Sequence, residues 1–140
     1  DSEITEKIIQ YYMNNKSKYD YVSNTIDRTY PRGLDTEVFN FNALKKAFNE
    51  AKSERDREHV TPYIWDNPIM FKLYQYRNKV NYSDLRWTLD TMKDFQLIKC
   101  IYDKLYLKNG NGFNMNDILT LYKKYPKLIK VNENIMQKEI

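Results

Sequence analysis

The sequence predicts an α/β fold, in which short strands alternate with helices along the chain. The first observation behind this prediction is the period-two alternation of Leu85, Trp87 and Leu89 with polar residues, which is typical of a strand with one buried face. The second is the helical spacing of apolar residues that follows at once, from Phe95 to Leu105. Both patterns recur along the chain between turn-forming residues, so neither an all-helical nor an all-strand protein is expected.

The first half of the chain predicts two helices and two strands. Asp1 or Ser2 can cap a first helix. Strands are expected near 19–24 and 35–41, and Asn42 can cap a second helix. The apolar residues expected on the buried faces of these two helices are Ile4, Ile8, Ile9, Tyr12, Leu44, Ala47, Phe48 and Ala51.

The middle of the chain continues with a helix and a further strand. Ser53 with Asp56 forms a capping pattern for a helix that Pro62 kinks or restarts. A strand is expected near 70–76. The elements expected toward the C-terminus are a turn at 108–112, a helix opened by Asn114 and Asp117 and closed by Pro126, and a polar tail with a short helix or a frayed end.

The strand predicted near 84–89 leads straight into a helix from about 92 to 106. Thr91 and Asp94 fit a T-x-x-D capping pattern, in which the Thr91 hydroxyl accepts from the N–H of the third helical residue. Asp90 therefore lies at the carboxyl end of a strand, beside a helix start. Because ligands of open α/β sheets collect beyond strand carboxyl ends, Asp90 is the acid best placed to do chemistry.

Composition narrows the class of protein. The 140 residues, 41% of them apolar, are one domain's worth of chain, and with three glycines the sequence contains no Gly-rich phosphate loop. The net charge of +4 comes from lysines scattered among acids, so nucleic acid is not an expected partner. The densest basic run, which we interpret as a solvated face, is Lys123, Lys124, Lys127 and Lys130.

Cys100 is the only cysteine, so neither a disulfide nor a cysteine-based metal site is possible within one chain. A single cysteine without a disulfide partner is typical of proteins in the reducing cytoplasm. The sequence has no signal peptide and no apolar run near 18 residues, so membrane insertion is not expected either.

Two segments place acids next to an arginine or a histidine. In 32–37 a glycine turn delivers Asp35 and Glu37 two residues apart, hence onto one strand face. The single histidine, His59, follows Glu58. Each segment also has a structural interpretation, the first as a solvated strand edge and the second as a paired histidine and carboxylate.

Arg86 and Asp90 form a third candidate site. They lie four residues apart on the predicted central strand, and this even spacing places both side chains on its polar side, opposite Trp87 and its apolar neighbours. A plain ion pair is one interpretation. The other is that the pair handles a metal ion or a phosphate.

Four motifs are more specific together than any cluster is alone. They are Y-V-S-N at 21–24, T-Y-P-R-G-L-D-T-E-V-F at 29–39, R-E-H-V-T-P-Y-I at 57–64 and L-R-W-T-L-D-T at 85–91. In this order they resemble the spore coat polysaccharide biosynthesis protein F family, which belongs with the cytidylyltransferases that activate sugar acids such as 3-deoxy-manno-octulosonate. The resemblance covers about residues 1–106.

The resemblance implies a nucleotide-diphospho-sugar transferase type of fold, with a mixed, mostly parallel sheet and flanking helices. Residues 1–4 look like those that follow the family's G-D-C-P-L-I segment. The chain is therefore expected to be a single domain, the C-terminal part of a longer nucleotidyltransferase whose nucleotide-binding half is absent.

The resemblance also implies roles for individual residues. In sugar-acid cytidylyltransferases the aspartate of a V-D-T-P-E-D-type motif joins an earlier aspartate in holding Mg²⁺. Residues 89–94 match that motif at Asp90, Thr91 and Asp94 and depart from it at the other three positions. Asp90 is thus expected to be a metal ligand and, with Arg86, catalytic. The implied substrate-binding residues, expected to share one concave face, are Arg32, Asp35, Glu37, Glu58 and His59.

We expect the chain to be one part of a cytidylyltransferase. The full-length enzyme would join a nucleoside triphosphate, CTP, to a sugar or sugar acid with release of pyrophosphate, in surface or spore coat polysaccharide biosynthesis. We expect the chain alone to be inactive, cytoplasmic and homodimeric, since truncation exposes apolar surface. The alternative is a non-catalytic protein-interaction or assembly module, and a basic nucleic-acid binder comes third.

Overall fold

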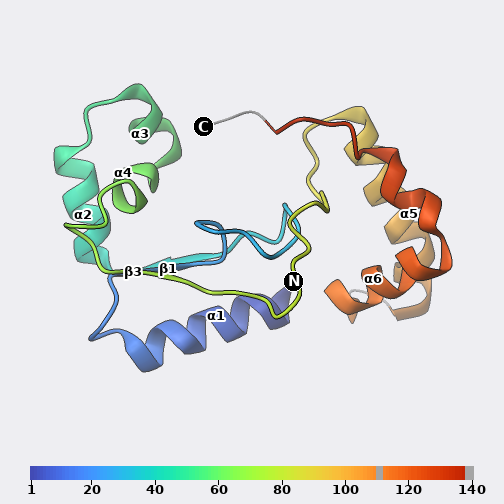
Figure 1. Ribbon diagram of the computed structural model, residues 1–140, viewed down its shortest axis with the longest axis horizontal. Coiled ribbons are helices and arrows are strands. Elements are labelled where there is room, and N and C mark those ends of the chain that lie inside the picture. The colour runs from blue at the N-terminus through green and yellow to red at the C-terminus, as the bar shows by residue number, and fades with distance from the viewer. Residues whose placement is uncertain (110–111, 138–140) are drawn as a thin grey trace.

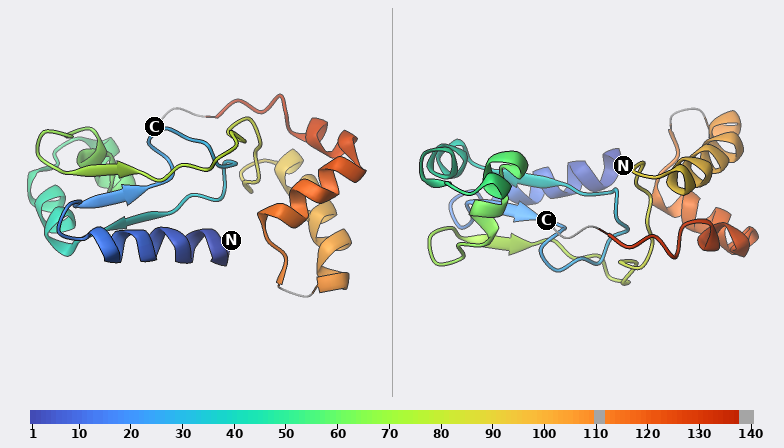
Figure 2. Two further views of the ribbon diagram at one scale, coloured as in Figure 1. Left: turned by 60° about the horizontal axis from the view of Figure 1, so that its bottom comes forward. Right: turned by 90° about the horizontal axis from the view of Figure 1, so that it is seen from above.

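The computed structural model describes residues 1–109 and 112–137, which form an α/β arrangement (Figure 1). A small sheet occupies the middle of the molecule. Helix α1 runs along the sheet, α2, α3 and α4 gather at one end, and α5 and α6 form the other end (Figures 1 and 2). In chain order the elements are α1 (Ser2–Asn15), β1 (Tyr21–Ser23), β2 (Glu37–Phe39), α2 (Phe41–Glu50), α3 (Glu54–His59), α4 (Pro62–Trp65), β3 (Leu73–Gln75), α5 (Met92–Asn109), α6 (Met115–Lys124) and the 3₁₀ helix η2 (Pro126–Val131).

The sheet has the order β2-β1-β3 within the described residues. Strand β1 is antiparallel to β2, with Val22 opposite Val38, and parallel to β3, with Val22 opposite Tyr74. The sheet is therefore mixed, as predicted, but these residues do not form the mostly parallel sheet that was expected. Strand β1 lies at its centre and is fully buried.

The prediction of a strand at 84–89 is wrong. The described chain forms only a single parallel bridge there, between Arg86 and Arg32, before α5 begins at Met92. The partner segment explains why the pairing stops. Pro31 before the bridge has no N–H to donate, and Gly33 after it turns the chain with a φ of 101°.

Side chains near 84–89 also depart from simple alternation. Leu89, expected to be buried, is 63% exposed, whereas Arg86, expected on the polar face, is only 8% exposed. The direct transition into a helix is confirmed, because α5 starts two residues after Asp90. It runs to Asn109, beyond its predicted end, and the predicted turn at 108–112 falls partly outside the described residues.

Most predicted helix caps are present. The Asp1 carboxylate accepts from the backbone N–H groups of Glu3 and Ile4, at 3.0 and 3.1 Å. The Ser53 hydroxyl caps α3, and Pro62 restarts the chain as α4 rather than kinking one helix. Helix α6 begins with a full capping box, formed by Asn114 and Asp117.

One cap and two buried positions were predicted wrongly. Asn40, not Asn42, caps α2 by accepting from the backbone N–H of Ala43 at 2.7 Å, because the preceding strand ends two residues earlier than expected. Ile9 and Phe48, expected on buried helix faces, are 43% and 68% exposed.

The buried apolar residues form two clusters, one toward each end of the molecule. The larger unites α1 and β1 with α5 and α6, and its members include Ile8, Trp87 and Leu97. The smaller lies between the sheet and α2–α4 and includes Tyr21 and Ile64. No helix in the described part of the chain is long and apolar enough to cross a membrane.

Candidate functional site

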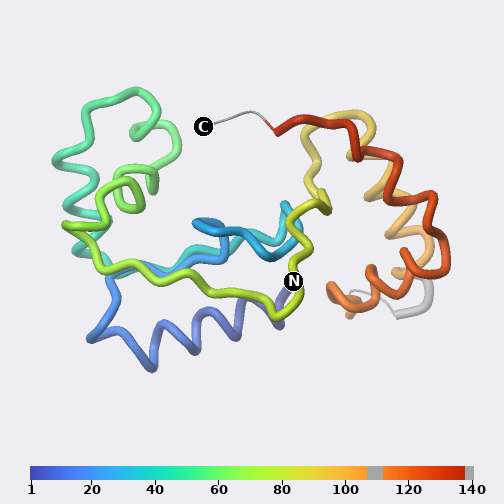
Figure 3. Tube along the Cα trace, viewed as in Figure 1, coloured from blue at the N-terminus to red at the C-terminus, as the bar shows by residue number. Residues whose placement is uncertain are grey.

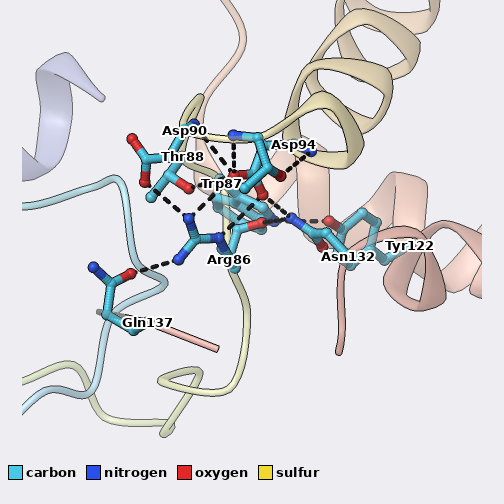
Figure 4. Close-up of polar contacts among 9 residues, drawn as sticks. Arg86, Trp87, Thr88, Asp90, Asp94, Tyr122, Asn132 and Gln137 are labelled. Atoms are coloured by element: carbon cyan, nitrogen blue, oxygen red, sulfur yellow. Dashed lines mark hydrogen bonds and ion pairs between the residues drawn. The ribbon is translucent and has the colours of Figure 1, made fainter. Parts of the chain in front are cut away.

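A buried ion pair stands at the start of α5. The side chain of Asp94 is 0% exposed and receives two bonds from Arg86, from Nε to Oδ1 at 3.0 Å and from Nη2 to Oδ2 at 3.1 Å (Figure 4). Burial alone would raise the pKa of the Asp94 carboxyl, but the hydrogen bonds from Arg86 and Asn132 outweigh it and hold that pKa far below its usual value.

Asp94 also caps its own helix. Its backbone N–H donates to the Thr91 hydroxyl at 3.2 Å, which confirms the predicted capping pattern, and its Oδ2 accepts from the backbone N–H of Thr91 at 3.1 Å. The Thr88 hydroxyl and the backbone N–H of Asp90 donate to the same oxygen, each at 3.2 Å. One carboxylate thus organises the whole turn between the bridge and α5.

The C-terminal segment completes this network. After α6 the chain turns back past α5 toward the middle of the molecule, and Asn132 and Gln137 both contact Arg86 (Figures 3 and 4). The Asn132 amide donates to Asp94 Oδ1 at 2.8 Å and to the Arg86 carbonyl at 3.0 Å, and Gln137 accepts from Arg86 Nη1. We call these four residues, Arg86, Asp94, Asn132 and Gln137, the arginine clasp. Every nitrogen of the Arg86 guanidinium is therefore engaged inside the protein.

Asp90 lies at the edge of the arginine clasp. Its side chain is 62% exposed, and its Oδ2 accepts from Arg86 Nη2 at 2.8 Å. Within residues 1–109 and 112–137, no group of three or more His, Cys, Asp and Glu side chains is arranged to hold a metal ion. Asp90 therefore fits a metal ion as a single carboxylate ligand, and further ligands would have to come from elsewhere.

A cavity of about 460 Å³ lies between the 25–37 region and α3–α4. It brings together three of the five predicted substrate-binding residues, Asp35, Glu37 and His59. Arg32 and Glu58 do not line it. We call this cavity the Glu37 pocket; its lining is Thr25, Ile26, Arg28, Asp35, Glu37, His59, Thr61, Pro62 and Trp65.

Asp35 is paired with an arginine that sequence reasoning missed. The guanidinium of Arg28 contacts both carboxylate oxygens of Asp35, with Nη2 to Oδ2 at 2.9 Å. Arg32, by contrast, makes no ion pair with any described residue. Burial lowers the pKa of Arg32 below its usual value, and the nearby charges of Arg28 and Arg86 act in the same direction while that of Asp35 opposes them.

Only one oxygen of the Glu37 carboxylate accepts hydrogen bonds from the described residues. Its Oε1 accepts from the hydroxyls of Tyr21 at 2.7 Å and Thr61 at 3.2 Å. The strand register makes the first contact possible, because Tyr21 pairs with Phe39 and Glu37 lies two residues along on the same face. Burial and the adjacent charge of Glu37 raise the pKa of Tyr21, so its hydroxyl stays a donor.

A tight turn aims two residues into the Glu37 pocket. The backbone N–H of Thr61 donates to the His59 carbonyl at 2.7 Å around Val60, whose φ is 66° and ψ is −54°. These are the angles of a γ-turn, and the left-handed φ is strained for a β-branched residue. His59 and Thr61, on either side of Val60, both line the pocket. Glu58 instead faces solvent, with its Oε2 at 3.9 Å from His59 Nε2.

Comparison with known proteins decides the family. A profile described as cytidylyltransferase matches residues 1–134. The chain belongs to the cytidylyltransferase family. The match covers the arginine clasp up to Asn132 and the whole of the Glu37 pocket.

Two curated relatives of this cytidylyltransferase chain differ in how much of it they cover. An uncharacterized protein of Methanocaldococcus jannaschii is 37% identical over 144 residues, which are 97% of this chain and 54% of the relative. The spore coat polysaccharide biosynthesis protein SpsF of Bacillus subtilis is 30% identical over 107 residues, 74% of this chain and 42% of that protein. The chain thus spans about half the length of the curated relatives it matches.

A solved structure supports the same assignment. A cytidylyltransferase from Leptospira borgpetersenii superposes with a TM-score of 0.85 at 28% identity, over 99% of this chain and 56% of that one. The family is therefore confirmed as cytidylyltransferase, while the narrower assignment to the spore coat protein F family is not. The prediction that this chain is a C-terminal part is not borne out by these comparisons and stays a prediction.

Proposed function

We propose that the whole protein containing this chain is a nucleotidyltransferase of the cytidylyltransferase type. It would join a cytidine nucleotide from CTP to a sugar or sugar acid and release pyrophosphate, for the biosynthesis of a surface or spore coat polysaccharide. The observation that carries this proposal is the family match over residues 1–134, which spans both Asp90 and the Glu37 pocket. The similarity to SpsF of Bacillus subtilis supports the polysaccharide role.

Asp90 is the proposed metal ligand of this chain. Its exposed carboxylate would hold Mg²⁺ together with ligands from outside the described residues, since one carboxylate rarely holds this ion alone. When bound, the ion neutralises charge on the triphosphate. Four of the five guanidinium N–H groups of Arg86 donate to Asp94, Asp90 and Gln137. We therefore propose that Arg86 positions Asp90.

The remaining candidate residues are proposed to bind the sugar substrate. Asp35, Glu37 and His59 share the Glu37 pocket and are proposed substrate-binding residues. Arg32, which makes no ion pair with a described residue, suits the carboxylate of a sugar acid, because a guanidinium can donate to both oxygens. Glu58, which is exposed beside His59, would contact the substrate only at the rim of the Glu37 pocket.

The remaining expectations concern assembly and location. Apolar side chains on α2 are unusually exposed, with Phe41 at 73% and Phe48 at 68%, and Ile69 is fully exposed. Exposed apolar patches mark interaction surfaces, so we propose that the protein forms a homodimer. A cytoplasmic location would give it access to CTP.

Replacing Asp90 by asparagine in the whole protein tests the proposed function. Asp90→Asn keeps the shape and removes the negative charge, so we expect pyrophosphate release from CTP and sugar to fall about a hundredfold or more. The matched control is Asp103→Asn, which removes an exposed carboxylate of α5 that is paired only with Lys99. Near-normal activity of Asp90→Asn at saturating Mg²⁺ would contradict the assignment. No pyrophosphate release by the unaltered protein would favour the assembly module instead.

A further inference from the structure

In the part of the chain that the structure describes, the Glu37 pocket contains one carboxylate oxygen that accepts no hydrogen bond. Glu37 Oε1 is occupied by the hydroxyls of Tyr21 and Thr61, while Oε2 accepts no bond from residues 1–109 or 112–137. Tyr21 is 0% exposed and Thr61 is 8% exposed, so the two donors are fixed by their surroundings. The carboxylate is therefore held in one orientation, with an acceptor left for a ligand.

The charge balance of the pocket favours an uncharged ligand. The two acids in its lining are Asp35 and Glu37, and Arg28 already neutralises Asp35. Glu37 has no cationic partner among the described side chains. A carboxylate or phosphate placed here would meet an uncompensated negative charge, whereas a hydroxyl would meet an acceptor.

The rest of the lining suits a sugar ring. Ile26 and Trp65 supply apolar surface next to the acceptors. A pyranose presents carbon-bound hydrogens on its faces and hydroxyls at its rim, and pockets of a few hundred Å³ with this mixture hold ligands of that size. The volume of about 460 Å³ is sufficient.

We propose that the Glu37 pocket binds the uncharged, hydroxyl-bearing ring of the sugar, and that Tyr21 and Thr61 are positioning residues that aim Glu37 Oε2 at its hydroxyls. This inference rests on the proposed function and deepens it, because it separates the ring from any acidic group of the same substrate. An acidic group would lie outside this pocket, and Arg32, which does not line it, is the cation available for such a group.

Backbone amide spectra of the whole protein test the inference without requiring turnover. The probes are D-glucose, D-galactose and D-mannose, each compared with its matching uronate, which has the same ring and an added carboxylate. At least one uncharged pyranose should shift the amides of Glu37, His59 and Thr61. Because Arg32 could hold a carboxylate outside the pocket, the uronates are compared in an Arg32→Gln variant, where each should bind more weakly than its uncharged sugar. Binding of the uronate as tightly as the uncharged sugar in that variant, or no pyranose shifts in the pocket of the unaltered protein, would overturn the inference.

Substitutions distinguish a positioning role from a structural one. Glu37→Gln should weaken pyranose binding about tenfold, the effect of losing one hydrogen bond to a charged acceptor, and should reduce the preference for the uncharged sugar over its uronate. Tyr21→Phe and Thr61→Val should each weaken binding about threefold with unchanged melting temperature, and Tyr21→Phe should add nothing in a Glu37→Gln background. Thr61→Ser, which keeps the hydroxyl, should restore binding.

Glu54→Gln, an exposed acid at the start of α3, serves as the control and should leave binding unchanged. Additive losses in the double variant, or an unaltered sugar-to-uronate preference in Glu37→Gln, would contradict the proposed roles. Failure here is distinct from failure of the proposed function. If the protein releases pyrophosphate but pyranoses shift no pocket amides, only the inference fails, and if pyranoses bind without turnover, only the proposed activity fails.

Discussion

The arginine clasp and the Glu37 pocket each centre on one carboxylate, but the two carboxylates differ in how many of their oxygens are used. Both oxygens of Asp94 accept bonds from the protein, and its side chain is fully buried. Glu37 has one occupied oxygen and lies at a cavity. A buried carboxylate with every lone pair engaged fixes structure, whereas an accessible one with a spare acceptor is available to a ligand.

The candidate residues predicted from the sequence are therefore of two kinds, those whose polar groups are engaged within the protein and those with an acceptor left for a ligand. Arg86 belongs to the first kind, because its guanidinium is shared among Asp94, Asp90 and Gln137. Asp35 is intermediate, because Arg28 neutralises it while leaving it exposed to the pocket.

The largest expected effect comes from breaking the arginine clasp. Arg86→Met leaves the Asp94 carboxylate buried without its cation, so we expect the free energy of unfolding to fall by about 3–5 kcal/mol. The matched control is Arg77→Met, which removes an ion pair to Asp27 that is exposed on both sides and should cost less than about 1 kcal/mol. Urea-induced unfolding of the whole protein measures both, and equal losses would contradict the structural role of Arg86.

A somewhat smaller effect is expected at the bridge that leads into the clasp. Gly33 has a φ of 101°, and an added Cβ would lie 2.3 Å from the Trp87 carbonyl oxygen. Gly33→Ala should therefore lower the free energy of unfolding by about 2–4 kcal/mol. Gly112→Ala is the control, since a Cβ there would meet no atom within 4 Å. If the two variants unfold at the same urea concentration, the close backbone contact is not important for stability.

Lowering the pH should destabilise the folded protein through protonation of the Asp94 carboxylate. The pKa of Asp94 is lower in the folded protein than its usual value of about 3.9, so the unfolded state binds the proton first as the pH falls. The stability it contributes is complete above that usual value and is lost below it, by up to about 1.4 kcal/mol per pH unit. Urea unfolding between pH 5 and pH 2 measures this slope. It should be shallower in Asp94→Asn than in the unaltered protein, and identical slopes in the two proteins would contradict the role of the Asp94 carboxylate.

Local signals in the sequence predicted most of the helices, because a cap depends on residues three positions apart. Thr91 with Asp94 and Asn114 with Asp117 are such pairs, and both form. The strand at 84–89 failed because pairing depends on the partner, and Pro31 and Gly33 limit that partner to one bridge. Its alternation of apolar and polar residues could not reveal this.

The candidate sites were predictable where residues are close in sequence and not where the fold brings them together. Spacing found Arg86 with Asp90, but Asn132 is 38 residues from Asp94 and carried no local signal. The contact of Tyr21 with Glu37 depends on the register of β1 and β2, which the sequence does not define. Two missed partners were nonetheless close in sequence: Arg28 lies seven residues before Asp35, and Asp94 lies eight residues after Arg86.

The central contrast is tested most directly by two matched substitutions of a carboxylate by an amide, measured side by side. Asp94→Asn and Glu37→Gln each remove one negative charge and keep the shape of the side chain. We predict that Asp94→Asn lowers the free energy of urea-induced unfolding by at least about 2 kcal/mol, because the buried Arg86 loses its counter-charge. Glu37→Gln should change it by less than about 0.5 kcal/mol, since that carboxylate is exposed. Equal losses, or a larger loss for Glu37→Gln, would contradict the assignment of structure to the clasp and ligand binding to the pocket.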